Sequence, residues 1–155
     1  MYDRDVDVPR LTSGYRLSEG NLPPALVEAA RRTIEATGAP FNRAGLNLYR
    51  DGRDSVAPHN DHLYEIVAGY PIALISLGAT RLMTIRSKTK PPLDSARDRR
   101  RLLDLDLEEG SLLLMSYETQ FHYDHGVPKT RASVGPRISV ALRVRPDEAS
   151  KSRPR

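Results

Sequence analysis

Two short segments of the sequence carry a histidine two residues before an aspartate, a spacing that can serve a metal ion. The first is His59-Asn60-Asp61 and the second is His122-Tyr123-Asp124. On a β-strand, residues i and i+2 point to the same face, so an imidazole and a carboxylate can converge on one ion. A third ligand from a distant strand would complete a set of two histidines and one carboxylate, which leaves coordination positions of the metal open. The spacing therefore predicts a metal site with room for further ligands.

The position of the remaining histidine decides between the two pairs. His125 lies too close to the second pair to act as a ligand from another strand, but it follows the first pair after several expected strands. We therefore predict that His59, Asp61 and His125 hold the metal. The alternative for the first pair is a surface turn closed by an Asp–His hydrogen bond. His62 is expected to lie outside the set, because on a strand its side chain would point to the opposite face.

The last expected strand, Arg137 to Arg145, alternates strictly between apolar and polar positions. One side carries Ile138, Val140, Leu142 and Val144, and the other carries Arg137, Ser139, Ala141, Arg143 and Arg145. An arginine that faces inward is costly to bury without an anionic partner. Because a guanidinium can grip a carboxylate through two parallel hydrogen bonds, an anionic cosubstrate would supply that partner. The alternative is that this face lies in solvent.

The chain that must position these residues has the size of one domain. It has 155 residues, with 39% hydrophobic and 28% charged residues, which fits a soluble globular protein. The absence of cysteine excludes disulfides, thiolate metal sites and cysteine nucleophiles. No apolar stretch approaches the roughly 20 residues that cross a bilayer, so no membrane partner is expected. The start of the chain lacks the pattern of a secretory signal, and we expect a cytoplasmic monomer.

Helix signals occur early and strand signals follow. A helix is predicted over 21–38, with Asn21 as the cap, prolines in the first turn and Gly38 as the stop. Short strands are predicted after it: 45–50, a hairpin of 71–77 with 81–86, a pair of 102–107 with 111–116, and 137–145. One helix followed by several short strands favours a mainly β fold, a helix-backed sandwich or jelly roll.

Basic residues gather in two clusters that could meet phosphate groups. The first cluster consists of Arg81, Arg86, Lys88 and Lys90, and the second of Arg97, Arg99, Arg100 and Arg101. A solvated loop over 88–101 is the alternative explanation for them. The polar segment 146–155 is expected to be a disordered tail.

Six motifs in order resemble the AlkB family of 2-oxoglutarate and Fe(II) dependent dioxygenases. They cover residues 45 to 145, about two thirds of the chain. The motifs are Asn47-Leu-Tyr49-Arg-Asp-Gly52, His59-Asn-Asp61, Pro71-Ile-Ala-Leu-Ile-Ser-Leu-Gly78, Gly110-Ser-Leu-Leu-Leu-Met-Ser116, His125-Gly-Val-Pro-Lys129 and Arg137-Ile-Ser-Val-Ala-Leu-Arg143. No motif is decisive by itself, and the order carries the resemblance.

The resemblance implies a double-stranded β-helix, the jelly-roll core of this superfamily, as one domain over 1–145. Within it, 1–20 would be the remnant of a nucleotide-recognition lid, 21–38 the helix and 43–145 the core. His59, Asp61 and His125 would hold Fe(II), which with O2 and 2-oxoglutarate carries the reaction. Alkylated nucleic acid would be the substrate, losing N-alkyl groups from its bases, which must leave the stack. The residues implied to hold 2-oxoglutarate are Asn47, Tyr49, Arg137, Ser139 and Arg143, with Arg137 on the distal carboxylate.

Three departures from the family pattern concern the substrate rather than the cofactor. The first acid after the His-x-Asp pair is Glu65, Tyr123 stands where a Trp is often found, and the N-terminal part is short. We therefore expect a short variant or an N-terminally truncated chain. The same chemistry on a protein side chain or a small molecule stays an alternative, as does a non-catalytic jelly-roll binding module.

Overall fold

The computed structural model describes residues 9–89 and 101–146. The elements are two helices, a short 3-10 helix at Leu63–Glu65, and β-strands that make up most of the regular structure. In chain order they are β1 (Leu11–Arg16), α1 (Pro24–Thr37), β2 (Arg43–Tyr49), β3 (Val56–His59), β4 (Ile72–Gly78), β5 (Arg81–Ser87), β6 (Arg101–Leu107), β7 (Leu112–Met115), α2 (Thr119–His122), β8 (Tyr123–Val127) and β9 (Arg137–Arg143).

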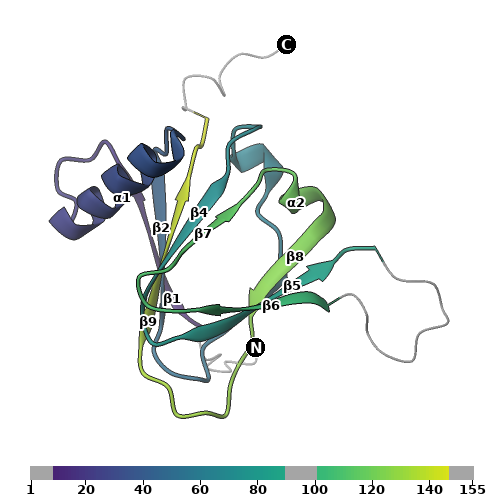
Figure 1. Ribbon diagram of the computed structural model, residues 1–155. Coiled ribbons are helices and arrows are strands. Elements are labelled where there is room, and N and C mark those ends of the chain that lie inside the picture. The colour runs from purple at the N-terminus through teal and green to yellow at the C-terminus, as the bar shows by residue number, and fades with distance from the viewer. Residues whose placement is uncertain (1–8, 90–100, 147–155) are drawn as a thin grey trace, which may run out of the picture.

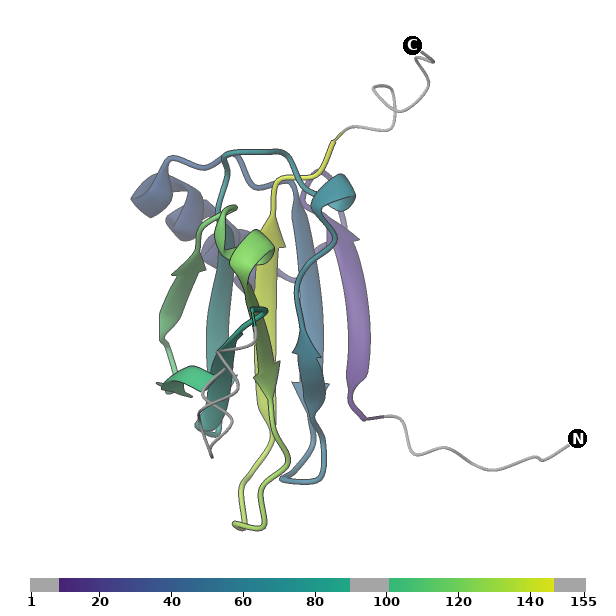
Figure 2. The same ribbon diagram turned by 90° about the vertical axis from the view of Figure 1, so that its right-hand side faces the viewer.

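The strands form two antiparallel sheets that face each other. One sheet has the order β1-β2-β9-β4-β7 and the other has the order β3-β8-β5-β6. Figure 1 shows the two sheets meeting at an angle, with α1 on the outer side of the larger sheet and α2 above the smaller one. Turned by 90°, the strands run side by side along the length of the molecule (Figure 2). This is the predicted helix-backed jelly roll, so the fold class is confirmed.

The alternation along β9 builds both halves of the core. Val140 and Leu142 pack with α1 residues such as Leu26 and Ala30 on the outer side of the sheet. Ala141, on the opposite face, belongs to the cluster between the two sheets. Each buried leucine contributes roughly 1.5–3 kcal/mol, so β9 is stabilised from both sides. The polar residues predicted on its inner face are therefore held on a rigid central strand.

The two hairpin predictions are wrong. The strands at 72–78 and 81–87 belong to different sheets, as do those at 101–107 and 112–115. The turn between the first two contains Gly78 at a φ of 84°, where a Cβ would meet the Pro136 carbonyl oxygen at 2.5 Å. Only glycine fits that conformation and that space. The chain therefore crosses from one sheet to the other in a turn as short as a hairpin turn.

The N-terminal part contains a strand that the sequence did not predict. Residues 11–16, which the resemblance places within the remnant of a lid, form β1, an edge strand paired in register with β2. Their burial pattern is almost entirely exposed, so hydrophobic alternation could not reveal the strand. The helix runs from Pro24 to Thr37 with Pro23 at the N-cap, not Asn21, while Gly38 ends it in the left-handed conformation with a φ of 69°.

Some predicted segments fall outside the part that the structure describes. Among the second basic cluster, Arg97, Arg99 and Arg100 lie there, as do Lys90 of the first and the tail from residue 147 onward. Among the described residues, the helices are too short or too polar to cross a membrane.

Candidate functional site

The two histidines of the predicted metal set face each other across a strand pair. His59 ends β3 and is the register partner of His125 on β8. Their ring centroids lie 4.5 Å apart. His125 is buried and His59 is partly exposed. The pairing of two strands from distant parts of the sequence therefore brings the imidazoles together at one end of the roll.

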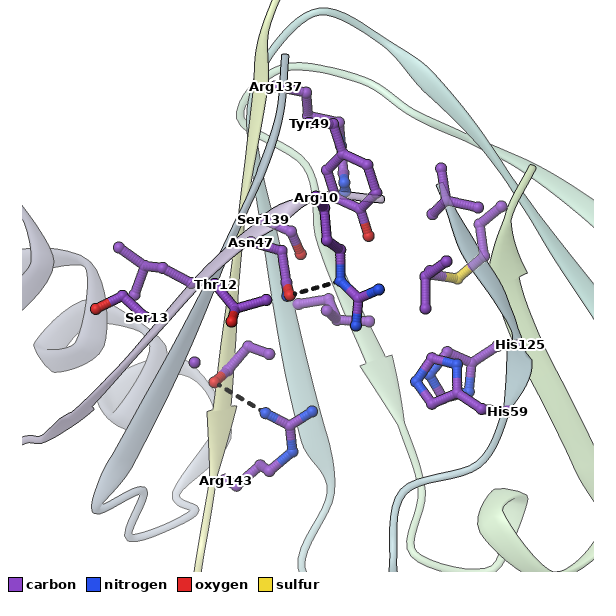
Figure 3. Close-up of a pocket in the computed structure, with 17 residues that line it drawn as sticks. Arg10, Thr12, Ser13, Asn47, Tyr49, His59, His125, Arg137, Ser139 and Arg143 are labelled. Carbon is purple, nitrogen blue, oxygen red and sulfur yellow. Dashed lines mark hydrogen bonds between the residues drawn. The ribbon is translucent and has the colours of Figure 1, made fainter. Parts of the chain in front are cut away.

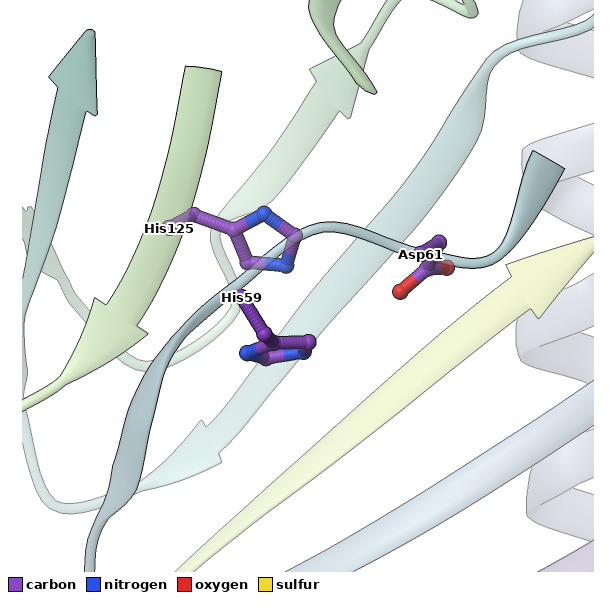
Figure 4. A group of neighbouring side chains, drawn as sticks. All are labelled: His59, Asp61 and His125. Carbon is purple, nitrogen blue, oxygen red and sulfur yellow. The ribbon is translucent and has the colours of Figure 1, made fainter. Parts of the chain in front are cut away.

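The carboxylate of Asp61 completes the cluster from the loop that follows β3 (Figure 4). One ligand atom from each of His59, Asp61 and His125 lies within 4.8 Å of the others. The prediction that Asp61 shares a strand face with His59 is wrong, because the strand ends at His59. The convergence comes instead from the loop backbone, which turns the carboxylate toward the rings.

Two contacts hold the Asp61 loop in place. The Asp61 N–H donates a hydrogen bond of 2.9 Å to Oε1 of Gln120, whose side chain is fully buried on α2. Nε of Arg143 donates to the Asp61 carboxylate and forms an ion pair with it. Gln120 is a residue that sequence reasoning missed, because a glutamine in a short polar helix gives no periodic signal.

The protonation preferences of the cluster suit a metal site. Burial, together with the repulsion of His59, lowers the pKa of His125 to about 4. For Asp61, burial acts to raise the pKa, but the hydrogen bond and charge of Arg143 outweigh it and the pKa is lowered. Neutral imidazoles and an ionised carboxylate are the forms that coordinate a divalent metal. His125 and Asp61 are therefore in their metal-binding forms at neutral pH.

The outer contacts of the two rings differ. Nδ1 of His59 lies 2.9 Å from the carbonyl oxygen of Ala57, so a proton on Nδ1 leaves Nε2 free to coordinate. Nδ1 of His125 is buried and has no hydrogen-bond partner among the described residues. A buried polar nitrogen without a partner is unusual, and a metal ion would satisfy it. The donor set of two nitrogens and one carboxylate suits iron among the divalent metals.

A cavity of about 190 Å³ opens beside the cluster, between the two sheets. Figure 3 shows the side chains of β2 and β9 along one wall and the two histidines on the opposite wall. The residues named from the sequence for the cosubstrate all line it: Asn47, Tyr49, Arg137, Ser139 and Arg143. The structure thus brings together in one cavity residues from strands that are far apart in the sequence.

Arg137 lines this cavity and is only 1% exposed. Its Nη2 donates a hydrogen bond of 2.9 Å to Oγ of Ser76, while Nε and Nη1 are buried without a partner in the described chain. Burial lowers the pKa of Arg137, although a guanidinium stays protonated at any ordinary pH. Two unsatisfied donors of a buried cation fit a carboxylate, which accepts two parallel hydrogen bonds. Ser76 is therefore a further residue of this part of the cavity, and the sequence did not identify it as a site residue.

The surroundings of Arg137 are aromatic and polar. The Tyr49 ring lies 5.3 Å from its guanidinium carbon, and burial raises the pKa of the Tyr49 hydroxyl. Nε of Arg10 donates a hydrogen bond of 3.0 Å to Oδ1 of Asn47, and its guanidinium points into the cavity in Figure 3. Arg10 had been expected in the lid remnant. Its position at the entry to β1 makes it a wall of the same cavity.

Other predicted residues lie away from the cluster. His122 is exposed at the end of α2, and no three-ligand group forms around it among the described residues. His62 is exposed and stacks on Tyr64, with ring centroids 5.2 Å apart. Arg81, assigned to a phosphate-binding cluster, is buried and donates to the backbone carbonyls of Asp51, Asp54 and Pro128. That part of the prediction is wrong, because Arg81 ties loops together inside the fold.

Comparison with known proteins agrees with this geometry. Residues 13–147 match the 2OG-Fe(II) oxygenase superfamily. The chain is 34% identical over 139 residues to the DNA oxidative demethylase ALKBH2 of Bos taurus, covering 90% of this chain and 50% of that protein. The corresponding mouse protein, from Mus musculus, is 35% identical over 143 residues, covering 90% and 58%. The human alpha-ketoglutarate-dependent dioxygenase alkB homolog 3 is 34% identical over 155 residues, covering 90% and 53%.

A solved structure titled "The structure of OsALKBH1" has the same fold with a TM-score of 0.56 at 16% identity. It covers 79% of this chain and 65% of that one. The match to the 2OG-Fe(II) oxygenase superfamily spans most of the chain, so the protein belongs to that superfamily. Its similarity to the ALKBH2 and alkB homolog 3 proteins assigns it to the AlkB family within the superfamily. The chain spans about half the length of the curated relatives it matches.

Proposed function

We propose that this protein is an Fe(II)- and 2-oxoglutarate-dependent dioxygenase that removes N-alkyl groups from the bases of nucleic acid. The observation that carries the proposal is the pairing, in one cavity, of a His-Asp-His cluster with a buried arginine that has two unsatisfied donors. The names of the relatives, which include DNA oxidative demethylases, support the choice of substrate. When bound, iron and 2-oxoglutarate supply the oxidising chemistry that the side chains of a protein lack.

The residues of this chain would share the work as follows. His59, Asp61 and His125 would hold the metal and leave its remaining positions to the cosubstrate and oxygen. Arg137 would bind the distal carboxylate of 2-oxoglutarate, beside the hydroxyl groups of Ser76 and Tyr49. Asn47 and Ser139 line the same cavity and would contact the cosubstrate between its ends.

Arg143 would have a different task from Arg137. Its guanidinium is already engaged with the Asp61 carboxylate, so it would orient that ligand and keep it ionised. The buried part of the cavity around Tyr49 and Arg137 would exclude water from the cosubstrate. Exclusion of water strengthens each charged contact inside.

Two exposed aromatic side chains that follow Asp61 in the sequence offer a surface for a base. His62 and Tyr64 follow Asp61 directly, and their rings form an exposed stacked pair, with Tyr64 73% exposed. Exposed aromatic rings next to a reaction centre suit the planar face of a nucleobase that has left its stack.

The proposal is tested by measuring succinate and formaldehyde from purified protein with Fe(II), ascorbate and 2-oxoglutarate. The substrates are methylated oligonucleotides, matched unmethylated oligonucleotides and methylated peptides. We expect formaldehyde in proportion to succinate with a methylated oligonucleotide. Stimulation by the methylated peptides alone would assign the protein side chain as the substrate, and no succinate under any condition would leave a binding module.

A further inference from the structure

Three arginines form a row across three neighbouring strands of the larger sheet. Arg16 on β1 is the register partner of Arg43 on β2, and Arg43 is the register partner of Arg143 on β9. Directly opposite residues of an antiparallel pair point to the same face of the sheet. Since Arg143 reaches Asp61 in the metal cluster, all three side chains lie on the face that looks toward the metal.

Like charges directly opposite each other destabilise a strand pair. Arg143 pairs with Asp61, and the neighbouring Arg145 pairs with Glu65. The guanidinium of Arg43 instead donates to a backbone carbonyl, that of Asn42, at 3.0 Å. The row thus places a cation between two others, at a position where an anion would relieve the repulsion.

A hollow lies beside the row because the adjacent positions have almost no side chains. Gly14, Gly45 and Ala141 are register partners across the same three strands. A cavity of about 380 Å³ occupies this place, and its charged lining residues are Arg16, Glu19, Arg43, Arg143 and Arg145. A Cβ on Gly45 would come within 3.3 Å of Nη1 of Arg143, so the glycine gives that guanidinium its space.

This second cavity adjoins the proposed active site. Gly45 and Arg143 line both it and the cavity beside the metal cluster. An anion held by Arg16 and Arg43 would lie between one and two strand spacings, roughly 5–10 Å, from the strand that carries Arg143. A phosphate group offers several oxygens and can accept from two neighbouring guanidiniums together, which a single carboxylate does less well.

We propose that Arg16 and Arg43 form a phosphodiester-binding subsite that holds the nucleic-acid backbone next to the base being repaired. The inference rests on the proposed function, because it takes nucleic acid as the partner. The sequence suggested that phosphate groups bind to the basic residues of β5 and of the segment between β5 and β6. The proposed subsite lies instead on β1 and β2, beside β9. Arg81, buried among backbone carbonyls, takes no part.

The test measures binding of a fluorescent, unmethylated single-stranded oligonucleotide by anisotropy at several salt concentrations, without iron or turnover. The variants are Arg43→Gln and Arg16→Gln. Arg32→Gln is the matched control, because Arg32 is an exposed arginine of α1 and the change in charge is the same. Each phosphate contact on a single strand contributes about 0.7 to the slope of log affinity against log salt. We expect Arg43→Gln and Arg16→Gln to lower the slope by about that amount and the control to leave it unchanged.

A thermal-unfolding measurement separates a binding role of Arg43 from a structural one. Because the three arginines repel one another, metal-free Arg43→Gln should unfold at a temperature equal to or above that of the wild-type protein, whereas loss of a structural role would lower the unfolding temperature.

A competition experiment identifies the kind of anion. A polyglutamate peptide of equal length serves as competitor, and displacement of the oligonucleotide at equal concentration would assign an acidic peptide as the ligand and overturn the inference.

The remaining outcomes distinguish the subsite from the function. Wild-type binding with the same slope in Arg43→Gln and Arg32→Gln would overturn the subsite and leave the proposed function to the succinate and formaldehyde assay. No oligonucleotide binding at low salt would also overturn the subsite. Demethylation of a methylated oligonucleotide in that second case would show that the function stands without it.

Discussion

Arg137 and Arg143 lie six positions apart on the same face of β9, yet their surroundings are opposite. Arg137 is fully buried, with one hydrogen bond to a neutral hydroxyl and two donors unsatisfied. Arg143 is partly exposed and is engaged with the carboxylate of Asp61. One guanidinium is thus prepared for an external anion, while the other already has an internal one.

The difference shows how one strand serves two tasks. A buried cation without an anionic partner is costly, and the cost is recovered only when a ligand binds. An internal ion pair orients the groups that form it in the free protein as well. We therefore expect Arg137 to determine the affinity for the cosubstrate and Arg143 to determine the orientation of Asp61.

The largest effect on activity is expected from the loss of a metal ligand in the cluster that Arg143 contacts. His125→Ala removes one of two imidazoles, and we expect no detectable 2-oxoglutarate turnover. His122→Ala is the matched control, because His122 is an exposed histidine three residues away. Succinate formation measures both. Unchanged turnover in His125→Ala, with loss in His122→Ala, would move the metal to the second His-x-Asp pair.

The role of Arg137 is tested through the cosubstrate. Arg137→Leu removes one partner of a desolvated charge pair, which costs about 2–5 kcal/mol, so the KM for 2-oxoglutarate should rise roughly 30-fold or more. Arg137→Lys restores the charge but not the bidentate geometry and should recover only part of the affinity. Metal binding should survive in both variants. A near-normal KM in Arg137→Leu would show that the cosubstrate lies elsewhere.

Gln120 sharpens the comparison at Asp61. Gln120→Leu removes the acceptor of the Asp61 N–H and should weaken Co(II) or Mn(II) binding by about tenfold, with 2-oxoglutarate affinity at saturating metal nearly unchanged. Gln120→Glu keeps an acceptor and should restore most of the metal affinity. Titration of the metal by calorimetry measures both. Equal losses in the two variants would point to disruption of α2 rather than to positioning of Asp61.

The smallest effect is a pH dependence of stability without metal. The pKa of His125 is about 4 in the folded protein against an ordinary value of 6.5. The unfolded chain therefore binds a proton that the folded chain does not bind, and stability is lost as the pH falls from about 6.5 toward 4. Urea unfolding at several pH values measures it. His125→Asn should flatten the profile, and parallel profiles would assign the loss to other groups.

The sequence predicted those parts of the fold and site that depend on local alternation or on rare residues. The alternation in residues 137–145 correctly separated the face toward the cavity from the face toward α1. The scarcity of histidine pointed to His125 as the distant partner of His59, and the structure pairs them. The first inference needed only the alternation of residue types along one strand, and the second needed only the small number of histidines in the sequence.

The failures concern contacts that no local pattern specifies. The turn at Gly78 has the length of a hairpin turn but leads to the opposite sheet, which depends on what each strand finds to pair with. β1 lacks hydrophobic alternation because one of its faces lines a polar cavity. Gln120 is a positioning group whose role exists only where α2 meets the Asp61 loop.

The central claim, that a metal at the His-Asp-His cluster and Arg137 hold 2-oxoglutarate between them, is tested most directly by calorimetry. 2-Oxoglutarate is titrated into the wild-type protein with and without Mn(II), a metal that occupies such sites. We expect one molecule to bind per chain, far more tightly with the metal than without it. Equal affinity in the two titrations, or no binding in either, would contradict the account.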